Sequence, residues 1–159
     1  MKLKLLSVIA VLASSTVYAQ TVEVRDAWVR ASVPGQTGTG AFMTLRASEG
    51  AKLVGASSPA AAVTEVHEMK MEGDVMKMRA LAGDLDLPAG KTVRLQAGGY
   101  HLMLMGLKTA LPKGSTVPLT LVFRYASGLQ ASVLLKVPVA AVAPGGQAAD
   151  KAAMTGHEH

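Results

Sequence analysis

Short runs in which apolar and polar residues alternate follow one another along most of the chain, separated by turn residues. Such alternation predicts β-strands, because successive side chains of a strand point to opposite faces. The runs that predict strands lie at 21–30, 41–46, 52–56, 64–71, 75–81, 92–95, 98–108, 117–125 and 129–139. We expect 32–40, which is rich in Gly, Pro, Ser and Thr, to be a loop. About eight or nine short strands without a convincing amphipathic helix predict an all-β sandwich or barrel.

The clearest predicted unit is a hairpin that joins 64–71 to 75–81 through the two-residue turn Gly73-Asp74. A turn of this length sets the register of the two strands, and therefore which side chains share a face. The resulting face carries an imidazole and four thioethers: Met71 opposite Met76, Met69 opposite Met78, and His67 diagonal to Met78. Glu68 opposite Arg79 makes the other face the wetter one.

The run Gly98 to Lys108 is the most informative stretch of the sequence, because it predicts a strand with one core face and one face of potential ligands. Alternation along it puts Leu102 and Leu104 on one face, and His101, Met103 and Met105 on the other. The leucine face is suited to a hydrophobic core. The other face presents an imidazole and two thioethers, which are ligands that a soft metal ion prefers. We interpret it as half of a copper site.

The two ends of the chain predict targeting and tail segments. Residues 1–19 combine lysines, a short apolar run and small residues before Gln20, which is typical of a secretory signal peptide cut after Ala19. The apolar run is too short to span a bilayer, and no cysteine stands at the cleavage point to carry a lipid anchor. We expect an exported, soluble, periplasmic protein with one domain at 20–142 and a disordered tail at 143–159.

Charge and cysteine content limit the possible functions. Removal of 1–19 takes away Lys2 and Lys4 and none of the eleven acidic residues, so the net charge falls from +5 to +3. This mild, scattered charge with few aromatic residues argues against nucleic-acid binding. The chain has no cysteine, so it has neither disulfides nor a thiolate ligand. We expect a monomer without stable membrane insertion and no enzymatic activity, since no arrangement of catalytic residues is evident.

The four histidines, His67, His101, His157 and His159, lie beside methionines in the predicted strands or in the tail. Mixed imidazole and thioether ligands favour Cu(I) over zinc or magnesium, and a ligand shell without negative charge suits a monovalent cation. Other conspicuous side chains have simpler interpretations. We expect Met43 and Trp28 to pack in the core, and the acidic residues Glu65, Glu68 and Glu72 to be solvated.

The spacing of these ligands resembles that of a known family, the PCu(A)C periplasmic copper chaperones, whose signature is H-x10-M-x21-H-x-M. Ten residues separate His67 from Met78, and His101-x-Met103 follows after 22 residues, one more than in that pattern. The segment from Gly98 to Leu104 is also similar to the family, as is Trp28-Val29-Arg30. The resemblance covers roughly residues 22–139.

This resemblance implies a cupredoxin-like, Greek-key β-sandwich that binds one Cu(I) through His67, Met78, His101 and Met103. It also implies delivery of copper to the Cu(A) centre of cytochrome c oxidase subunit II, alongside Sco-type proteins with a thioredoxin fold. Some members carry a copper-binding C-terminal extension, and a short version of it here would take additional copper, including Cu(II). The accessory ligands that we consider are Met69, Met76, Met105, Met154, His157 and His159.

Three alternatives use the same observations differently. A periplasmic copper buffer or resistance protein would use the same ligands without a dedicated oxidase acceptor. A blue-copper electron carrier would need a cysteine thiolate, which the chain lacks. A plain β-sandwich for adhesion or assembly would carry its methionines by accident.

Overall fold

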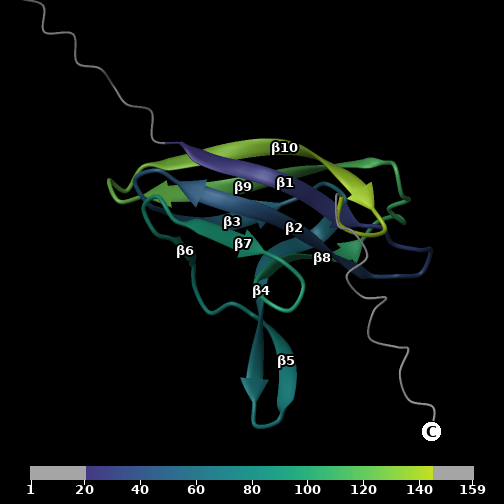
Figure 1. Cartoon of the computed structure of the whole chain (residues 1–159). Helices are drawn as coiled ribbons and strands as arrows, with labels where there is room; N and C mark the ends of the chain where they lie inside the picture. The colour runs from purple at the N-terminus through teal and green to yellow at the C-terminus, as the bar shows by residue number, and fades with distance from the viewer. Residues whose placement is uncertain (1–20, 145–159) are drawn as a thin grey trace, which may run out of the picture.

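The computed structural model describes residues 21–144, so the expected signal peptide and all but the first two residues of the expected tail lie outside the described residues. Within 21–144 the chain forms ten β-strands and no helix (Figure 1). No helix of this part is long and apolar enough to cross a membrane. The strands are β1 (Val22–Arg30), β2 (Gly38–Ala47), β3 (Ala51–Ser57), β4 (Ala61–Glu72), β5 (Val75–Ala80), β6 (Leu85–Leu87), β7 (Thr92–Leu95), β8 (His101–Leu107), β9 (Thr116–Tyr125) and β10 (Gln130–Ala140).

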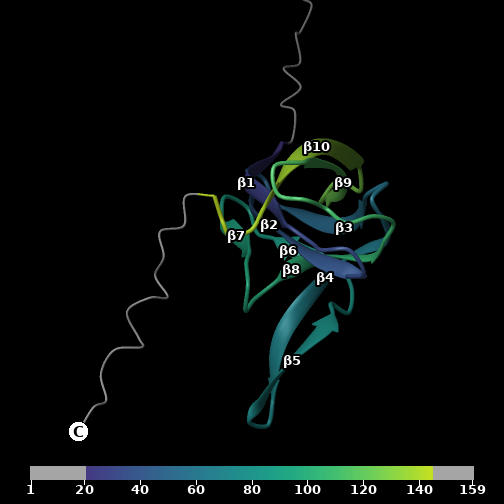
Figure 2. The same ribbon diagram turned by 90° about the vertical axis from the view of Figure 1, so that its right-hand side faces the viewer.

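The strands form a β-sandwich, which confirms the all-β prediction. They are hydrogen-bonded in the order β5-β4-β8-β2-β1-β10-β9-β3-β6, and β7 pairs with β2 beyond the end of β8. All these pairings are antiparallel except that of β1 with β10. The parallel pair connects a layer that contains β1, β2, β7, β8 and β4 to one that contains β10, β9, β3 and β6 (Figure 2).

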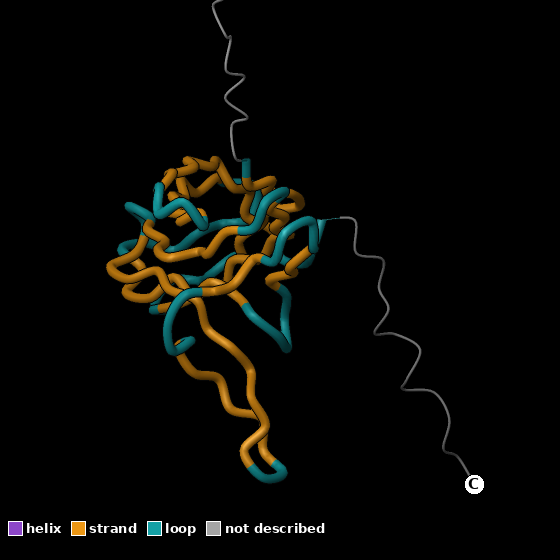
Figure 3. The backbone as a smooth tube through the Cα atoms, turned by 90° about the vertical axis from the view of Figure 1, so that its left-hand side faces the viewer, coloured by secondary structure: helices purple, strands orange, loops and turns teal. Residues whose placement is uncertain are grey.

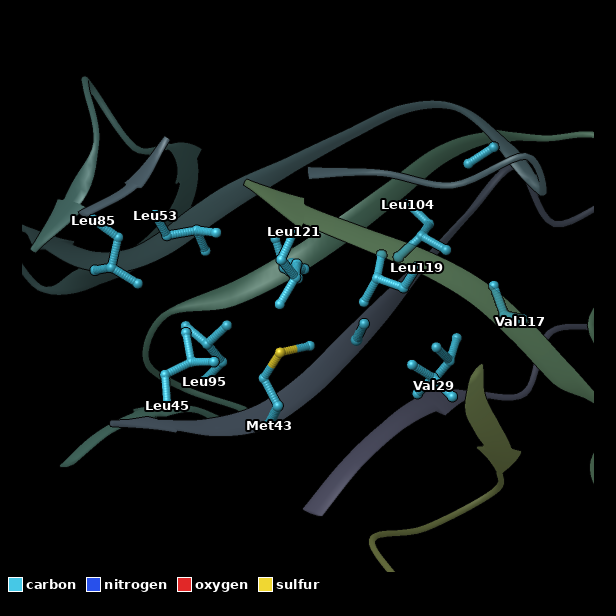
Figure 4. Packing of buried hydrophobic residues seen from close by; sticks show 14 of the residues in the cluster. Val29, Met43, Leu45, Leu53, Leu85, Leu95, Leu104, Val117, Leu119 and Leu121 are labelled. Atoms are coloured by element: carbon cyan, nitrogen blue, oxygen red, sulfur yellow. The ribbon is translucent and has the colours of Figure 1, made fainter. Parts of the chain in front are cut away.

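The core lies between the two layers and is mainly aliphatic (Figure 4). The alternation predicted for β8 is confirmed, because Leu102 and Leu104 are completely buried in it. Met43 is 3% exposed and packs in the same core, as expected. The largest fully buried side chains are Phe123, Leu45, Leu87, Leu95, Leu102, Leu104, Leu119 and Leu121. Burial of such a set is the main source of stability for a chain without disulfides.

A bulge in β1 changes the expected position of Trp28. Arg25 pairs with Thr44, but the next pair is Trp28 with Phe42, so β1 has one more residue than β2 between the two pairs. Asp26 occupies the left-handed region there with φ of 52°, which aspartate tolerates better than most residues. The extra residue reverses the alternation of faces. Trp28 is therefore buried against Phe42 on the outer face of the layer rather than in the main core.

Other elements also differ from the sequence prediction. Strand β2 begins at Gly38, inside the expected loop, because Gly38 and Gly40 pair with β8. Strand β6 is an additional strand of three residues that pairs with β3. A three-residue run between turns is too short to show a periodicity of its own, and only its pairing partner stabilises it as a strand.

The β4–β5 hairpin extends away from the sandwich (Figures 1 and 3). Its register is the one expected from the two-residue turn, with Met71 opposite Met76 and Met69 opposite Met78. Gly73 supplies the positive φ of 64° that this turn requires. The wetter face carries the expected ion pair between Arg79 and Glu68, with an N–O distance of 2.9 Å. β5 is exposed along its whole length and forms one edge of the sheet.

We expect Leu104→Ala to lower the free energy of unfolding by about 2 to 5 kcal/mol, because it leaves a cavity in the core directly beneath the His101 face. Leu134→Ala is a matched control, since Leu134 is 69% exposed and its removal opens no cavity. Chemical denaturation of both variants measures the difference. Equal losses of stability would contradict the assignment of the core.

Candidate metal centre

The two histidines of the folded domain lie side by side because β4 and β8 are neighbouring antiparallel strands. His67 is directly opposite His101 in the register, and the centroids of the two rings are 6.0 Å apart. Both residues are buried, with exposed fractions of 8% for His67 and 6% for His101. Although they lie far apart in the sequence, the two imidazoles therefore share one largely buried site on the outer face of the layer.

The hydrogen bonds of His101 determine which of its nitrogens is free. Nδ1 lies 3.1 Å from the carbonyl oxygen of Gly99. A carbonyl can only accept, so we assign the ring hydrogen to Nδ1, which leaves a lone pair on Nε2. Nε2 lies 3.1 Å from Sδ of Met78, which also carries only lone pairs. Two electron-pair donors facing each other at this distance form a site for a cation.

His67 shows the same division between its two nitrogens. Nε2 lies 3.0 Å from Oε1 of Glu65, and a carboxylate can only accept, so we assign the hydrogen to Nε2. Nδ1 is then a lone-pair donor, and it is buried without a hydrogen-bond partner. A buried polar atom normally finds a partner, so an unpartnered one is a reason to expect a ligand. An oxygen acceptor behind each ligating imidazole is also the usual arrangement in metal sites.

The distances fit a shared ion with small adjustments. Bonds of about 2.0 Å to imidazole nitrogen and about 2.3 Å to sulfur, at a tetrahedral angle, put the two donor atoms about 3.5 Å apart. The Nε2 to Sδ distance of 3.1 Å is slightly shorter than that. Two imidazoles bound to one ion have ring centroids about 5 to 6 Å apart by the same geometry. The observed 6.0 Å lies at the upper end.

A cavity of about 310 Å³ opens in front of His101, and its lining includes three methionines, Met69, Met78 and Met103. Met103 comes from β8, where it pairs with Gly40 of β2 on one side and with Glu65 of β4 on the other. Gly40 has little room for a side chain, since an added Cβ would approach the Phe42 ring to 2.9 Å. The structure therefore brings His101, Met78 and Met103 to one cavity, with His67 beside His101.

The accessory candidates separate into three groups. Met69 lines the cavity together with Met78, its cross-strand partner. Met105 and Met76 do not line it: Met105 lies further along β8, opposite Gly38, and Met76 lies nearer the hairpin tip. The expected tail ligands Met154, His157 and His159 lie outside the described residues.

Aromatic packing supports the His101 ring from behind. The ring centroid of Phe42 is 6.4 Å from that of His101 and 4.8 Å from that of Trp28. The Arg30 guanidinium lies 5.4 Å from the Phe42 centroid, which is within the range of a cation–π contact. Sequence reasoning put Trp28 in the core, because the bulge in β1 that turns it to this face leaves no periodic signal. It also missed Phe42, although the regular alternation of β2 puts Phe42 on the face opposite the core residues Ala41 and Met43.

Glu65 corrects a further expectation, namely that it is simply solvated. Its side chain is 43% exposed, yet its carboxylate contacts His67. Residues i and i+2 of a strand share a face, so the position of Glu65 relative to His67 was a usable signal. Glu68 and Glu72 form ion pairs with Arg79 and Lys77 on the hairpin.

Methionine is necessary to complete a ligand set here. Between residues 21 and 144, no three His, Cys, Asp or Glu side chains gather closely enough to hold a metal ion. A larger hollow of about 700 Å³ adjoins the site along β1, β2 and β7, but its lining contains no histidine, and its one methionine is the core residue Met43. Donor chemistry rather than volume therefore identifies the smaller cavity as the candidate metal centre.

Solved structures support the fold. The "Copper-bound PCuAC domain from PmoF2" has a TM-score of 0.61 and 23% identity, over 79% of this chain and 97% of that one. The "Apo PCuAC domain from PmoF1" has a TM-score of 0.64 and 22% identity, over 79% and 98%. The expected resemblance to PCu(A)C domains is thus confirmed for the fold.

More similar sequences point to a family. The "Solution structure of CuI-DR1885" from Deinococcus radiodurans is 33% identical, with a TM-score of 0.57, over 84% of this chain and 86% of that one. "Putative lipoprotein Lxx21020" of Leifsonia xyli subsp. xyli (strain CTCB07) is 35% identical over 119 residues, which cover 75% of this chain and 70% of that protein. Residues 22–139 match the family described as "Putative lipoprotein LpqE-like". The chain therefore belongs to the LpqE-like family.

Proposed function

We propose that this protein is a metallochaperone that carries one Cu(I) between His67, Met78, His101 and Met103. The observation that carries the proposal is the pair of facing lone-pair donors, His101 Nε2 and Met78 Sδ, at 3.1 Å. The buried and unpartnered Nδ1 of His67 supports it as a further donor close by. Met103, which lines the cavity with His101 and Met78, completes a proposed set of two nitrogen and two sulfur ligands.

Ligand chemistry favours cuprous copper as the cargo. Thioethers are soft donors that select Cu(I), whereas zinc, magnesium and calcium prefer nitrogen, thiolate or oxygen. Two similar solved structures carry copper in their titles, one as a copper-bound PCuAC domain and one as CuI-DR1885. Glu65 would not contact the ion itself; its carboxylate would orient the His67 ring by accepting the Nε2 hydrogen.

The unequal exposure of the ligands suits delivery of the ion. His67 and His101 are buried, whereas Met78 is 49% exposed on the projecting hairpin. An acceptor ligand would reach the ion from the Met78 side and form one bond as the bond to sulfur breaks. The buried imidazoles would be released later. Transfer by stepwise exchange needs no change in the oxidation state of the copper.

The finer part of the proposal concerns where the cargo goes. We propose export to the periplasm, since a relative is named as a putative lipoprotein and residues 1–19 read as a signal peptide. The acceptor would be the Cu(A) centre of cytochrome c oxidase subunit II, with a Sco-type protein acting alongside. Both partners follow from the PCu(A)C resemblance.

Removal of one sulfur should weaken copper binding only at the site. We expect Met103→Leu to lower the affinity for Cu(I) strongly, and Met43→Leu to leave it unchanged, because both keep the side-chain volume but only Met103 lines the cavity. Competition with a coloured Cu(I) chelator measures both affinities. Equal affinities would contradict the proposed ligand set.

Glu65→Ala should reduce the affinity for Cu(I) by about 10- to 100-fold, because the His67 ring loses the acceptor that orients it. Glu72→Ala is a matched control on the same strand, since its carboxylate pairs with Lys77 near the hairpin tip. The same chelator competition compares the two variants. A Glu65→Ala affinity equal to that of the control would show that Glu65 does not support the site.

Delivery separates a chaperone from a copper buffer. We expect the copper-loaded protein to pass its ion to the apo soluble domain of cytochrome c oxidase subunit II, after reduction of the Cu(A) cysteines. Copper analysis of the two proteins after chromatographic separation measures the transfer, with the Met103→Leu variant as donor control. Retention of copper by the donor would contradict delivery and would favour the alternative of a copper buffer.

A further inference from the structure

The β4–β5 hairpin carries more methionines than one copper site can use. Met71 is directly opposite Met76, and Met69 is directly opposite Met78, so four thioethers form two adjacent cross-strand pairs on one face. Facing Cβ atoms of such pairs are about 5 Å apart, and successive pairs on one face are about 7 Å apart. We call these four residues the methionine ladder. Its inner pair lines the cavity at His101, and its outer pair lies next to the turn.

Packing does not explain the outer pair. Met71 is 54% exposed and Met76 is 46% exposed, although methionine usually fills gaps in a core. The hairpin extends away from the sandwich, so no other part of the described chain covers its end (Figures 2 and 3). Apolar side chains on an exposed edge strand are a liability, because edges promote association. Their presence needs a reason other than stability.

Where β4 and β5 pair, at residues 67–72 and 75–80, the charged side chains lie on the other face. Lys70 pairs with Lys77 in the register, and ion pairs join Lys77 to Glu72 at 2.7 Å and Arg79 to Glu68 at 2.9 Å. Beyond His67, the ladder face of the paired strands therefore presents sulfur as its only strong side-chain donor. Flexible side chains with about 5 to 7 Å between their Cβ atoms can bring three sulfurs to one ion.

We propose that Met71 and Met76, with a sulfur of the inner pair, form a second, all-thioether site for a soft monovalent cation. With the proposed function accepted, this site is where Cu(I) enters. A site of neutral sulfurs in solvent holds the ion more loosely than one with two buried imidazoles. Loose capture at the tip followed by tighter binding at the base gives copper a direction of travel.

Met78 connects the two sites, because it belongs to the inner pair and also faces His101. In each transfer step the ion forms one bond, first to the Met78 sulfur and then to His101 Nε2, as one bond to an outer sulfur breaks. No electron or proton is exchanged, because thioethers do not titrate and Nε2 already carries a lone pair. The ion remains Cu(I) throughout.

The test follows each methionine by its ¹³C-labelled methyl signal while Cu(I) alone is added to the full chain without oxygen. We expect the first equivalent to shift Met78 and Met103, and the second to shift Met71 and Met76. In a His67→Ala, His101→Ala variant, Met71 and Met76 should still shift. In a Met71→Leu, Met76→Leu variant, the second equivalent should no longer bind on the hairpin, while the affinity of the first stays unchanged.

Met43→Leu is the matched control, since it removes a sulfur from the core and should preserve both equivalents. Methyl signals of Met71 and Met76 that stay unchanged while Met103 shifts would overturn this inference alone, and would assign the ladder face to protein contact. A second equivalent that shifts only Met154 would also overturn it, because the ion would then bind in the tail. No shift at any methionine would overturn the proposed function as well.

Discussion

The antiparallel pairing of β4 with β8 is the interaction on which the rest of this molecule depends. It places His67 opposite His101, and no local segment of the chain could do so. Leu102 and Leu104 hold the register, because both are completely buried on the opposite face of β8. A slip of one residue would send the imidazoles into the hydrocarbon core and the leucines to the surface. Core packing and site geometry are therefore two consequences of one strand pairing.

At the two histidines that this pairing brings together, oxygen acceptors determine which imidazole nitrogen is available to bind an ion. The Gly99 carbonyl takes the hydrogen of one ring and the Glu65 carboxylate that of the other, so each histidine keeps one lone pair free. The two acceptors differ in kind: His101 has a backbone carbonyl next to a turn, and His67 has a side chain on its own strand. Both act before any ion arrives, which lowers the cost of ordering the ligands.

The fold separates a rigid base from an exposed arm. The sandwich body buries the histidines, and aromatic contacts through Phe42 support the His101 ring. The hairpin, by contrast, carries its methionines in solvent on an edge strand with few packing contacts. Segments of this kind are the least stable parts of a domain and move most readily. A carrier that must both hold and release an ion benefits from ligands of both kinds.

Local patterns in the sequence were sufficient for the β-class, the hairpin with its methionine pairs, and the two faces of β8, because period-two alternation and a two-residue turn act over a few residues. They were insufficient for Trp28, whose side chain turns outward only because of the bulge at Asp26. They also could not establish that β4 lies beside β8, or that His67 Nδ1 remains without a partner. Alternation tells which face a side chain takes within its own strand. Which strands become neighbours is decided by the packing of the whole core, and only that packing brings two distant histidines side by side.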